Sequence, residues 1–211
     1  MVSSIRTPPP REPEPAWDVA RLFPDQGHWT EGDYLFLTNL TNGLVELTDG
    51  YVEVLEMPKT PHQFIVAYLY GVFLSFVSTR KLGKILFAPL NVRLRTGVFR
   101  QPDLAYMAHE NAKRIGIEYW DGADLVLEVV SEDVKSRKRD LIEKKQEYAD
   151  ARIREYWVID PQDEVVTVFK LRGSKYVKHG TWARGETARS ALLAGLEVDV
   201  ENVLNAARGN Q

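Results

Sequence analysis

The order of hydrophobic and polar positions predicts a chain that mixes helices with strands. Thr30 and Asp33 form a capping box, which predicts a short helix beginning there. Two alternating runs, GLVEL and YVEVLEM, flank turn residues at 48–50 and predict a β-hairpin. These signals favour an α/β arrangement from the first part of the chain onward.

The longest apolar stretch predicts a helix from Thr60 to about Thr79. We expect Thr60 to cap this helix, Pro61 to lie in its first turn and Gln63 to complete a capping box. Apolar side chains occur on nearly all sides of the helix. Such a helix is buried or packs against a partner, so it belongs either to the core or to a homodimer interface.

The remaining pattern predicts a mixed sheet with flanking helices. Strand-like segments ILFAPLNVRLR, QPDLAYM and DLVLEVV precede a helix that ends near Asp150. A hairpin-like pair, REYWVID and EVVTVFK, and a final helix, VENVLNAA, follow. The order predicts an α/β fold with a mixed central β-sheet and an N-terminal hairpin extension. One domain over 17–211 is expected, after a tail at 1–16 whose Pro, Glu and Arg content predicts disorder.

Composition narrows the class of protein. With 44% hydrophobic and 27% charged residues, the chain has the balance of a soluble globular protein. No apolar run approaches the roughly 20 residues of a membrane span, so no membrane partner is expected. The absence of cysteine excludes thiolate zinc sites and disulfides, and fits a cytoplasmic location. A net charge of −3 argues against a surface coated for nucleic acid, but allows a local basic groove.

Two carboxylates interrupt strand-like apolar runs. Asp103 opens QPDLAYM, and Glu128 lies inside DLVLEVV. A carboxylate is costly to bury alone, so each needs a cation or a strong donor. If the two strands are neighbours, both carboxylates can reach one Mg²⁺, which can activate water for phosphodiester hydrolysis. The alternative is that Glu128 pairs with an arginine and Asp103 caps a turn.

The helix after DLVLEVV carries Asp140, Lys144 and Tyr148 at four-residue steps, which place them along one side. A helical wheel centres the apolar stripe near Val134, Leu141, Tyr148 and Ala149, and puts Lys145 nearer to that centre than Lys144. The pattern alone does not choose between the two lysines. Both can also extend their amines to solvent.

Three further features carry weaker signals. Glu46 lies in the first hairpin, where exposure is expected, and His62 lies in a first helical turn, where solvation or capping explains it. His62 could still act as a base, because its ordinary pKa is near 6.5. The basic segment 135–145 predicts either a solvated helix face or a positive wall for a phosphate backbone. Its cations are Lys135, Arg137, Lys138, Arg139, Lys144 and Lys145.

From about Glu46 to Lys170 the chain resembles the Uma-type family of restriction endonucleases, in the PD-(D/E)XK nuclease superfamily. The matching pieces, in order, are VELTDGYVEVLEMP, PHQ, QPDLAYM and ADLVLEVVSEDVKSRKRDLIEKKQEYADARIREYWVIDP. The last block is the most specific, because it combines E-V-V-S, D-x-x-x-K-x-x-x-Y and EYWVIDP.

The resemblance implies a restriction-endonuclease-like core and cleavage of DNA that depends on Mg²⁺, with Mn²⁺ as a substitute. By family position Asp103 is the motif aspartate and Glu128 is the acid of the E-x-K element. Val130 occupies the usual lysine position, and the resemblance maps that lysine to Lys144. Glu46 matches an early acidic position that would add to the metal shell. The rival hypothesis is a non-catalytic DNA-binding or protein-interaction module that retains the nuclease fold.

Overall fold

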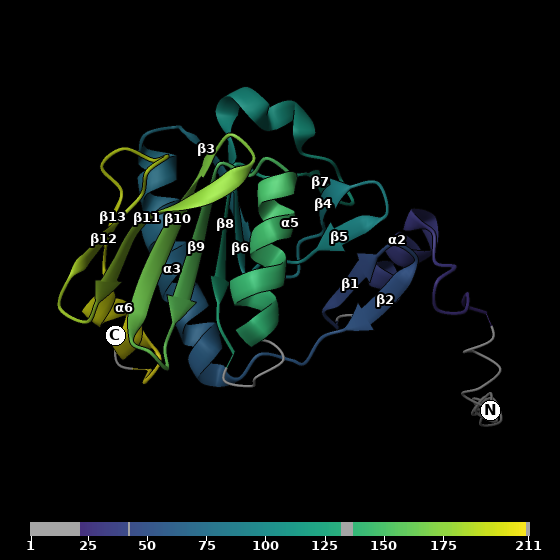
Figure 1. Ribbon diagram of the computed structural model, residues 1–211, viewed down its shortest axis with the longest axis horizontal. Helices are drawn as coiled ribbons and strands as arrows, with labels where there is room; N and C mark the ends of the chain where they lie inside the picture. The colour runs from purple at the N-terminus through teal and green to yellow at the C-terminus, as the bar shows by residue number, and fades with distance from the viewer. Residues whose placement is uncertain (1–21, 42, 132–136, 210–211) are drawn as a thin grey trace, which may run out of the picture.

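Two main β-sheets lie side by side, each with helices packed against it (Figure 1). The computed structural model describes residues 22–41, 43–131 and 137–209, and leaves the side chain of Asp140 undescribed. The predicted tail at 1–16 and Lys135 lie outside the described residues.

The larger sheet has six strands in the order β11-β10-β9-β8-β6-β3. Strands β8 and β9 run parallel, and every other neighbouring pair runs antiparallel, so the sheet is mixed as predicted. The strands are β3 (Gly83–Phe87), β6 (Leu104–Ala108), β8 (Leu125–Val129), β9 (Glu155–Asp160), β10 (Val165–Arg172) and β11 (Lys175–Ala183).

Helices cover both faces of this sheet. Helices α3 (Thr60–Thr79) and α6 (Val200–Ala206) pack on one face, and α5 (Lys144–Asp150) crosses the other (Figure 1). Alternate side chains of β8 enter the two cores: Leu127 packs on the α3 side and Val126 on the α5 side. Because side chains alternate along a strand, Glu128 shares the face of Val126 and points toward α5.

The smaller sheet has five strands in the order β2-β1-β5-β4-β7. The predicted hairpin of β1 and β2 is present, and β1 also pairs with β5, so the hairpin continues into a second sheet. Helix α2 packs on this sheet through Tyr34. The elements are α2 (Glu31–Leu40), β1 (Val45–Thr48), β2 (Tyr51–Val54), β4 (Val92–Arg95), β5 (Val98–Arg100) and β7 (Trp120–Asp121). A 3₁₀-helix (His109–Arg114) and the paired strands β12 (Thr187–Arg189) and β13 (Glu197–Asp199) complete the fold.

One expected strand is divided between the two sheets. The run ILFAPLNVRLR forms β3 in the larger sheet and β4 in the smaller one, with Pro89 between them. Proline has no N–H to donate to a strand ladder, so this position suits the crossing between sheets.

The start of α3 differs from the sequence prediction. The helix begins at Thr60, and Lys59 occupies the N-cap position without a side-chain cap hydrogen bond. Thr60 therefore does not cap the helix, because its backbone already belongs to the first turn. Pro61 does lie in that turn, where the missing N–H of proline costs no helical hydrogen bond.

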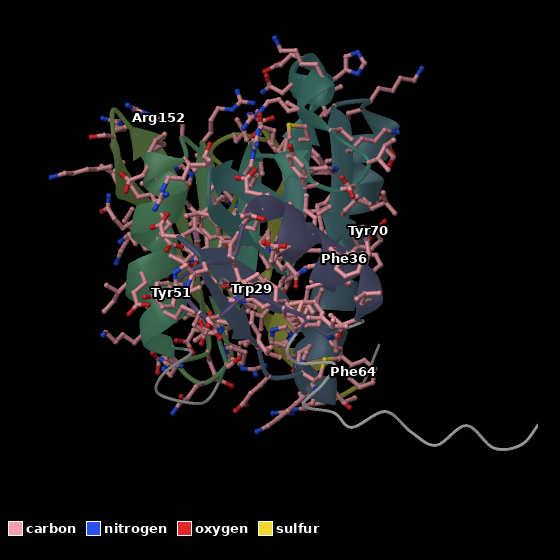
Figure 2. The ribbon with its side chains drawn as sticks, turned by 90° about the vertical axis from the view of Figure 1, so that its right-hand side faces the viewer. Trp29, Phe36, Tyr51, Phe64, Tyr70 and Arg152 are labelled. Carbon is pink, nitrogen blue, oxygen red and sulfur yellow. The ribbon has the colours of Figure 1, made fainter. Side chains whose placement is uncertain are left out.

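Among the described residues, α3 alone is long and apolar enough to cross a membrane by length and composition. The sequence prediction counted no such stretch, because polar residues interrupt the apolar run. One face of α3 lies in the core, where Leu69 and Phe73 are fully buried. Phe64 and Leu74 on the same helix are 39% and 38% exposed. Figure 2 shows Phe64 near the lower end of α3 and Tyr70 above it.

Candidate active site

Asp103 and Glu128 lie opposite each other at the same end of two neighbouring strands. In the antiparallel pair of β6 and β8, Leu104 is paired with Leu127, and the same register continued by one residue, just before β6 begins, places Asp103 opposite Glu128. Directly opposite residues point to the same face, with Cβ atoms about 4.5–5.5 Å apart. The N–H of Val129 donates a 2.7 Å hydrogen bond to Oδ2 of Asp103 and fixes this carboxylate at the strand end.

Glu128 is paired with a lysine and a tyrosine. Its Oε1 atom accepts hydrogen bonds from Nζ of Lys144 at 2.9 Å and from the hydroxyl of Tyr148 at 2.5 Å. All three side chains are buried. Nζ of Lys144 also lies 3.6 Å from Oε1 of Glu46. Lys144 is therefore held between two carboxylates, and Glu128 pairs with this lysine.

A π-helical segment, Arg139–Glu143, precedes α5 and changes which side chains face the sheet. The N–H of Lys144 donates to the carbonyl of Arg139, five residues earlier. Each such turn takes more residues than an α-turn, so the faces of a continuous helical wheel no longer apply. Lys145 lies over the ring of Phe169 with Nζ 3.9 Å from its centroid, and Leu141 is exposed. Tyr148 and Ala149 of the predicted stripe are buried, so the wheel was right about them and wrong about Leu141. It was also wrong about the lysines, since Lys144 and not Lys145 is the buried one, and Val134 lies outside the described residues.

Glu46 is buried, although its place in a hairpin predicted exposure. Arg100 of β5 and Lys144 of α5 lie against this carboxylate, and the N–H of Gln101 donates a hydrogen bond to it, so it is covered from solvent. Burial by itself would raise the pKa of Glu46. The positive charges of Lys144, Arg100 and Arg139 outweigh that effect and hold the pKa of this carboxyl below its usual value. Glu46 thus carries a negative charge that helps to position Lys144.

His62 contacts Asp103 directly, and its side chain is only 15% exposed. Its Nε2 atom lies 3.2 Å from Oδ2 of Asp103 and 3.1 Å from the carbonyl oxygen of Val129. Both partners are acceptors, so Nε2 carries the proton. Burial lowers the pKa of His62, but the hydrogen bond and charge of Asp103, with the charge of Glu128, raise it overall. Nδ1 is buried and has no hydrogen-bond partner among the described residues.

Arg100 is a site residue that the sequence reasoning missed. It is buried, forms a bidentate pair with Glu147 at 2.6 and 2.8 Å, and lies 3.7 Å from Glu46. It joins β5 to α5 and so connects the smaller sheet to the helix that carries Lys144. Its position immediately before the Gln-Pro-Asp run was the available signal, since this cation adjoins the motif that contains Asp103.

A cleft of about 540 Å³ opens beside these residues. Asp103, Glu128, Lys144 and His62 line one part of it, together with Arg139. Apolar side chains line the other part, mainly from the segment between β2 and α3 and from the first turns of α3. The arrangement places two carboxylates and a lysine at the wall of a cavity, where binding and catalytic sites commonly lie.

A family model described as "Putative restriction endonuclease", Uma2, matches residues 32–201. The chain belongs to the Uma2 family. The fold of this Uma2 protein is similar to the crystal structure of a protein from Anabaena variabilis, described as a "putative nuclease belonging to DUF820". The TM-score is 0.61 with 15% identity, over 79% of this chain and 93% of that chain. The likeness confirms the predicted α/β fold class. A search of curated proteins gave no match.

The side chains of the Uma2 site suit a magnesium ion held by two carboxylates. Magnesium is commonly bound through one or two carboxylates, with waters and substrate phosphates as its other ligands. Among the described residues, no group of three or more His, Cys, Asp or Glu side chains gathers as a metal site. Lys144 lies between Glu46 and Glu128, which explains why Glu46 does not join Asp103 and Glu128.

The basic segment of this Uma2 protein is largely engaged within the molecule. Arg137 forms a bidentate pair with Asp160 at 2.7 and 2.9 Å, and Lys138 lies 3.4 Å from Glu143. Lys144 is buried in the site. The expected positive wall therefore consists mostly of cations that already have partners in the described part of the chain.

Proposed function

We propose that this Uma2 protein is a Mg²⁺-dependent endonuclease that hydrolyses phosphodiester bonds in DNA, with Mn²⁺ as a substitute ion. The observation that carries the proposal is the pairing of Asp103 opposite Glu128, with the amine of Lys144 2.9 Å from Glu128, beside a cleft. Membership of a family described as restriction endonucleases supports the same reaction class.

Asp103 and Glu128 would hold the magnesium ion. When bound, the ion supplies a hydroxide-like water and offsets negative charge on the phosphate. Lys144 donates hydrogen bonds toward the attacking water or a phosphate oxygen and stabilises the charge that develops there. In the reaction the water oxygen bonds to phosphorus, one P–O bond breaks, and a proton ends on the leaving oxygen.

The neighbouring side chains position these three groups. Tyr148 holds Oε1 of Glu128, and Glu46 holds the amine of Lys144 from its other side. His62 holds Oδ2 of Asp103. Asp140 stays a candidate from its four-residue spacing to Lys144.

The proposal includes a cytoplasmic location, which the cysteine-free composition supports. It also includes a homodimer through the exposed part of α3, since Phe64 and Leu74 are apolar and partly exposed there. Sedimentation of the purified protein tests the dimer.

Plasmid nicking by purified protein in Mg²⁺, with EDTA as the control, tests the activity. We expect nicking in Mg²⁺ and none in EDTA.

Lys144→Met should reduce the rate at least about a hundredfold, as loss of one transition-state donor does. Lys145→Met is the matched control and should keep the rate, because Lys145 lies over Phe169 outside the carboxylate pair. DNA binding without cleavage in either Mg²⁺ or Mn²⁺ would instead support the non-catalytic DNA-binding module.

A further inference from the structure

The cleft beside the carboxylates has two chemically different walls. One wall carries the charged groups of the proposed site. The other is formed mainly by aliphatic side chains and prolines, with the charged Glu56 and Lys59 among them and no Phe, Tyr or Trp among its described members. The apolar lining residues from positions 44–65 are Leu44, Leu55, Met57, Pro58, Pro61 and Ile65.

Met57 stands at the rim of the apolar wall and is 68% exposed. An exposed, flexible thioether gains free energy when a flat apolar surface covers it. Leu55 lies deeper in the same wall and is partly buried. The segment between β2 and α3 therefore presents apolar surface toward the cavity that also contains Asp103 and Glu128.

We propose that this apolar wall receives an unpaired nucleobase next to the scissile phosphate, so that the preferred substrate is single-stranded or locally unpaired DNA. The inference rests on the proposed phosphodiesterase function of the same site. It names the substrate class that the function leaves open.

The volume and chemistry of the cleft match this occupant. A cavity of about 540 Å³ lies within the roughly 300–1,000 Å³ range of sites for small organic groups. A phosphate held at the carboxylates carries its neighbouring base into the same cavity. An unstacked base has two apolar faces, and apolar side chains can pack against them.

A continuous duplex makes poorer use of the same surface. Its outward face offers phosphates and sugars, and its bases stay stacked between their neighbours. Firm duplex binding also depends on many lysines and arginines that reach phosphates. Near the site Arg137 is paired with Asp160, and Lys145 lies over a ring. The apolar wall is thus used only when a base leaves the stack.

The test measures binding without cleavage. Fluorescence anisotropy is recorded in Ca²⁺, which takes the same oxygen ligands as Mg²⁺. The probes are a labelled single strand of about 12 nucleotides, the same strand with one abasic position, and the blunt duplex of that sequence. We expect the intact single strand to bind about tenfold tighter than the duplex, and the abasic strand to bind more weakly than the intact one.

Substitutions in the wall locate the effect. Leu55→Asp and Met57→Asp should each lower single-strand affinity about tenfold and leave duplex affinity unchanged. Because Met57 is exposed, its substitution leaves the fold intact and decides the matter if Leu55→Asp does not fold. Val54→Asp is the matched control, since Val54 is 72% exposed on β2 and lies outside the cleft lining.

Two results would overturn the inference: duplex binding as tight as single-strand binding, or a Met57→Asp variant with unchanged single-strand affinity. These results are distinguishable from failure of the proposed function. Nicking activity with equal affinities contradicts the base-binding wall alone. A single-strand preference in a protein that never cuts contradicts the nuclease activity alone.

Discussion

At the residue scale, the charge balance of the site depends on one lysine between two acids. Lys144 lies 2.9 Å from Glu128 and 3.6 Å from Glu46, and all three are buried. Without this cation the two carboxylates would repel each other in a region of low dielectric constant. The lysine therefore stabilises the metal-free protein. In the proposed reaction it also lies beside the place of the attacking water and the phosphate.

Glu128→Gln should abolish metal-dependent nicking and lower the free energy of unfolding by about 1–3 kcal/mol. The amide removes a charge that the metal requires and leaves the buried amine of Lys144 with a more distant carboxylate partner, Glu46. Urea unfolding and plasmid nicking of the same preparation measure both effects. Glu143→Gln is the control, because its pair with Lys138 is exposed and contributes little. Unchanged or raised stability of Glu128→Gln would show that repulsion between carboxylates outweighs the lysine pair.

His62 should make stability depend on pH near neutrality. Asp103 raises the pKa of His62 in the folded protein. The contribution of His62 to the free energy of unfolding is therefore fully present below its unfolded-state pKa, which is near 6.5. That contribution is lost as pH rises through the higher folded-state pKa. Wild type should therefore lose more unfolding free energy between about pH 6 and 9 than His62→Gln does. The control is His109→Gln, at an exposed position outside the cleft. Parallel pH profiles for wild type and His62→Gln would contradict the expectation.

At the element scale, α3 has two functions in the fold. Its buried face fills the core under the larger sheet, and its first turn brings His62 to the cleft. Phe73 is fully buried, with its ring edge-on to Trp157 at 5.4 Å between centroids. The next residue, Leu74, is partly exposed. Neighbouring positions on this helix thus differ in what they contribute to stability.

Phe73→Ala should lower the free energy of unfolding by about 3–5 kcal/mol, because it removes a buried ring and leaves a cavity. In the monomer, at protein concentrations too low for association, Leu74→Ala should cost less than about 1 kcal/mol, since much of its surface faces solvent. Urea denaturation followed by circular dichroism, repeated at increasing protein concentration, measures both variants. The cost of Leu74→Ala should rise with concentration when the proposed homodimer covers this face, and a cost as large as that of Phe73→Ala at the lowest concentration would contradict the expectation.

At the scale of the whole molecule, the charged site connects the two main sheets. Glu46 and Arg100 belong to the smaller sheet, and Glu128 belongs to the larger one. Lys144 and Glu147 of α5 contact residues from both sides. The sheets therefore share buried ion pairs that neither would keep alone.

The molecule should unfold in one cooperative transition, with calorimetric and van't Hoff enthalpies nearly equal. Arg100→Met should lower the midpoint and reduce cooperativity, because it removes the bidentate contact between β5 and Glu147. Arg93→Met, whose pairs with Glu31 and Asp121 are partly exposed, is the control and should have a smaller effect. Two resolved transitions in the wild type would instead show that the sheets unfold as separate domains.

The sequence by itself determined the elements whose signals are local. Alternation in DLVLEVV fixed the face of Glu128, and the capping box at Thr30 fixed the start of α2. The hairpins and the extent of α3 also followed from periodicity and turn residues. Local chemistry was sufficient there because a strand or a helix repeats its pattern over a few residues.

Only the tertiary structure decided which side chains meet. The register of β6 and β8 brings Asp103 opposite Glu128, and the π-helical turn selects Lys144 over Lys145. The burial of Glu46 depends on Arg100 of β5 and Lys144 of α5 lying against it, which no local pattern reveals. Contacts between residues far apart in the chain depend on strand register and helix phase, and these are set by packing across the whole fold and not by the nearest neighbours in sequence.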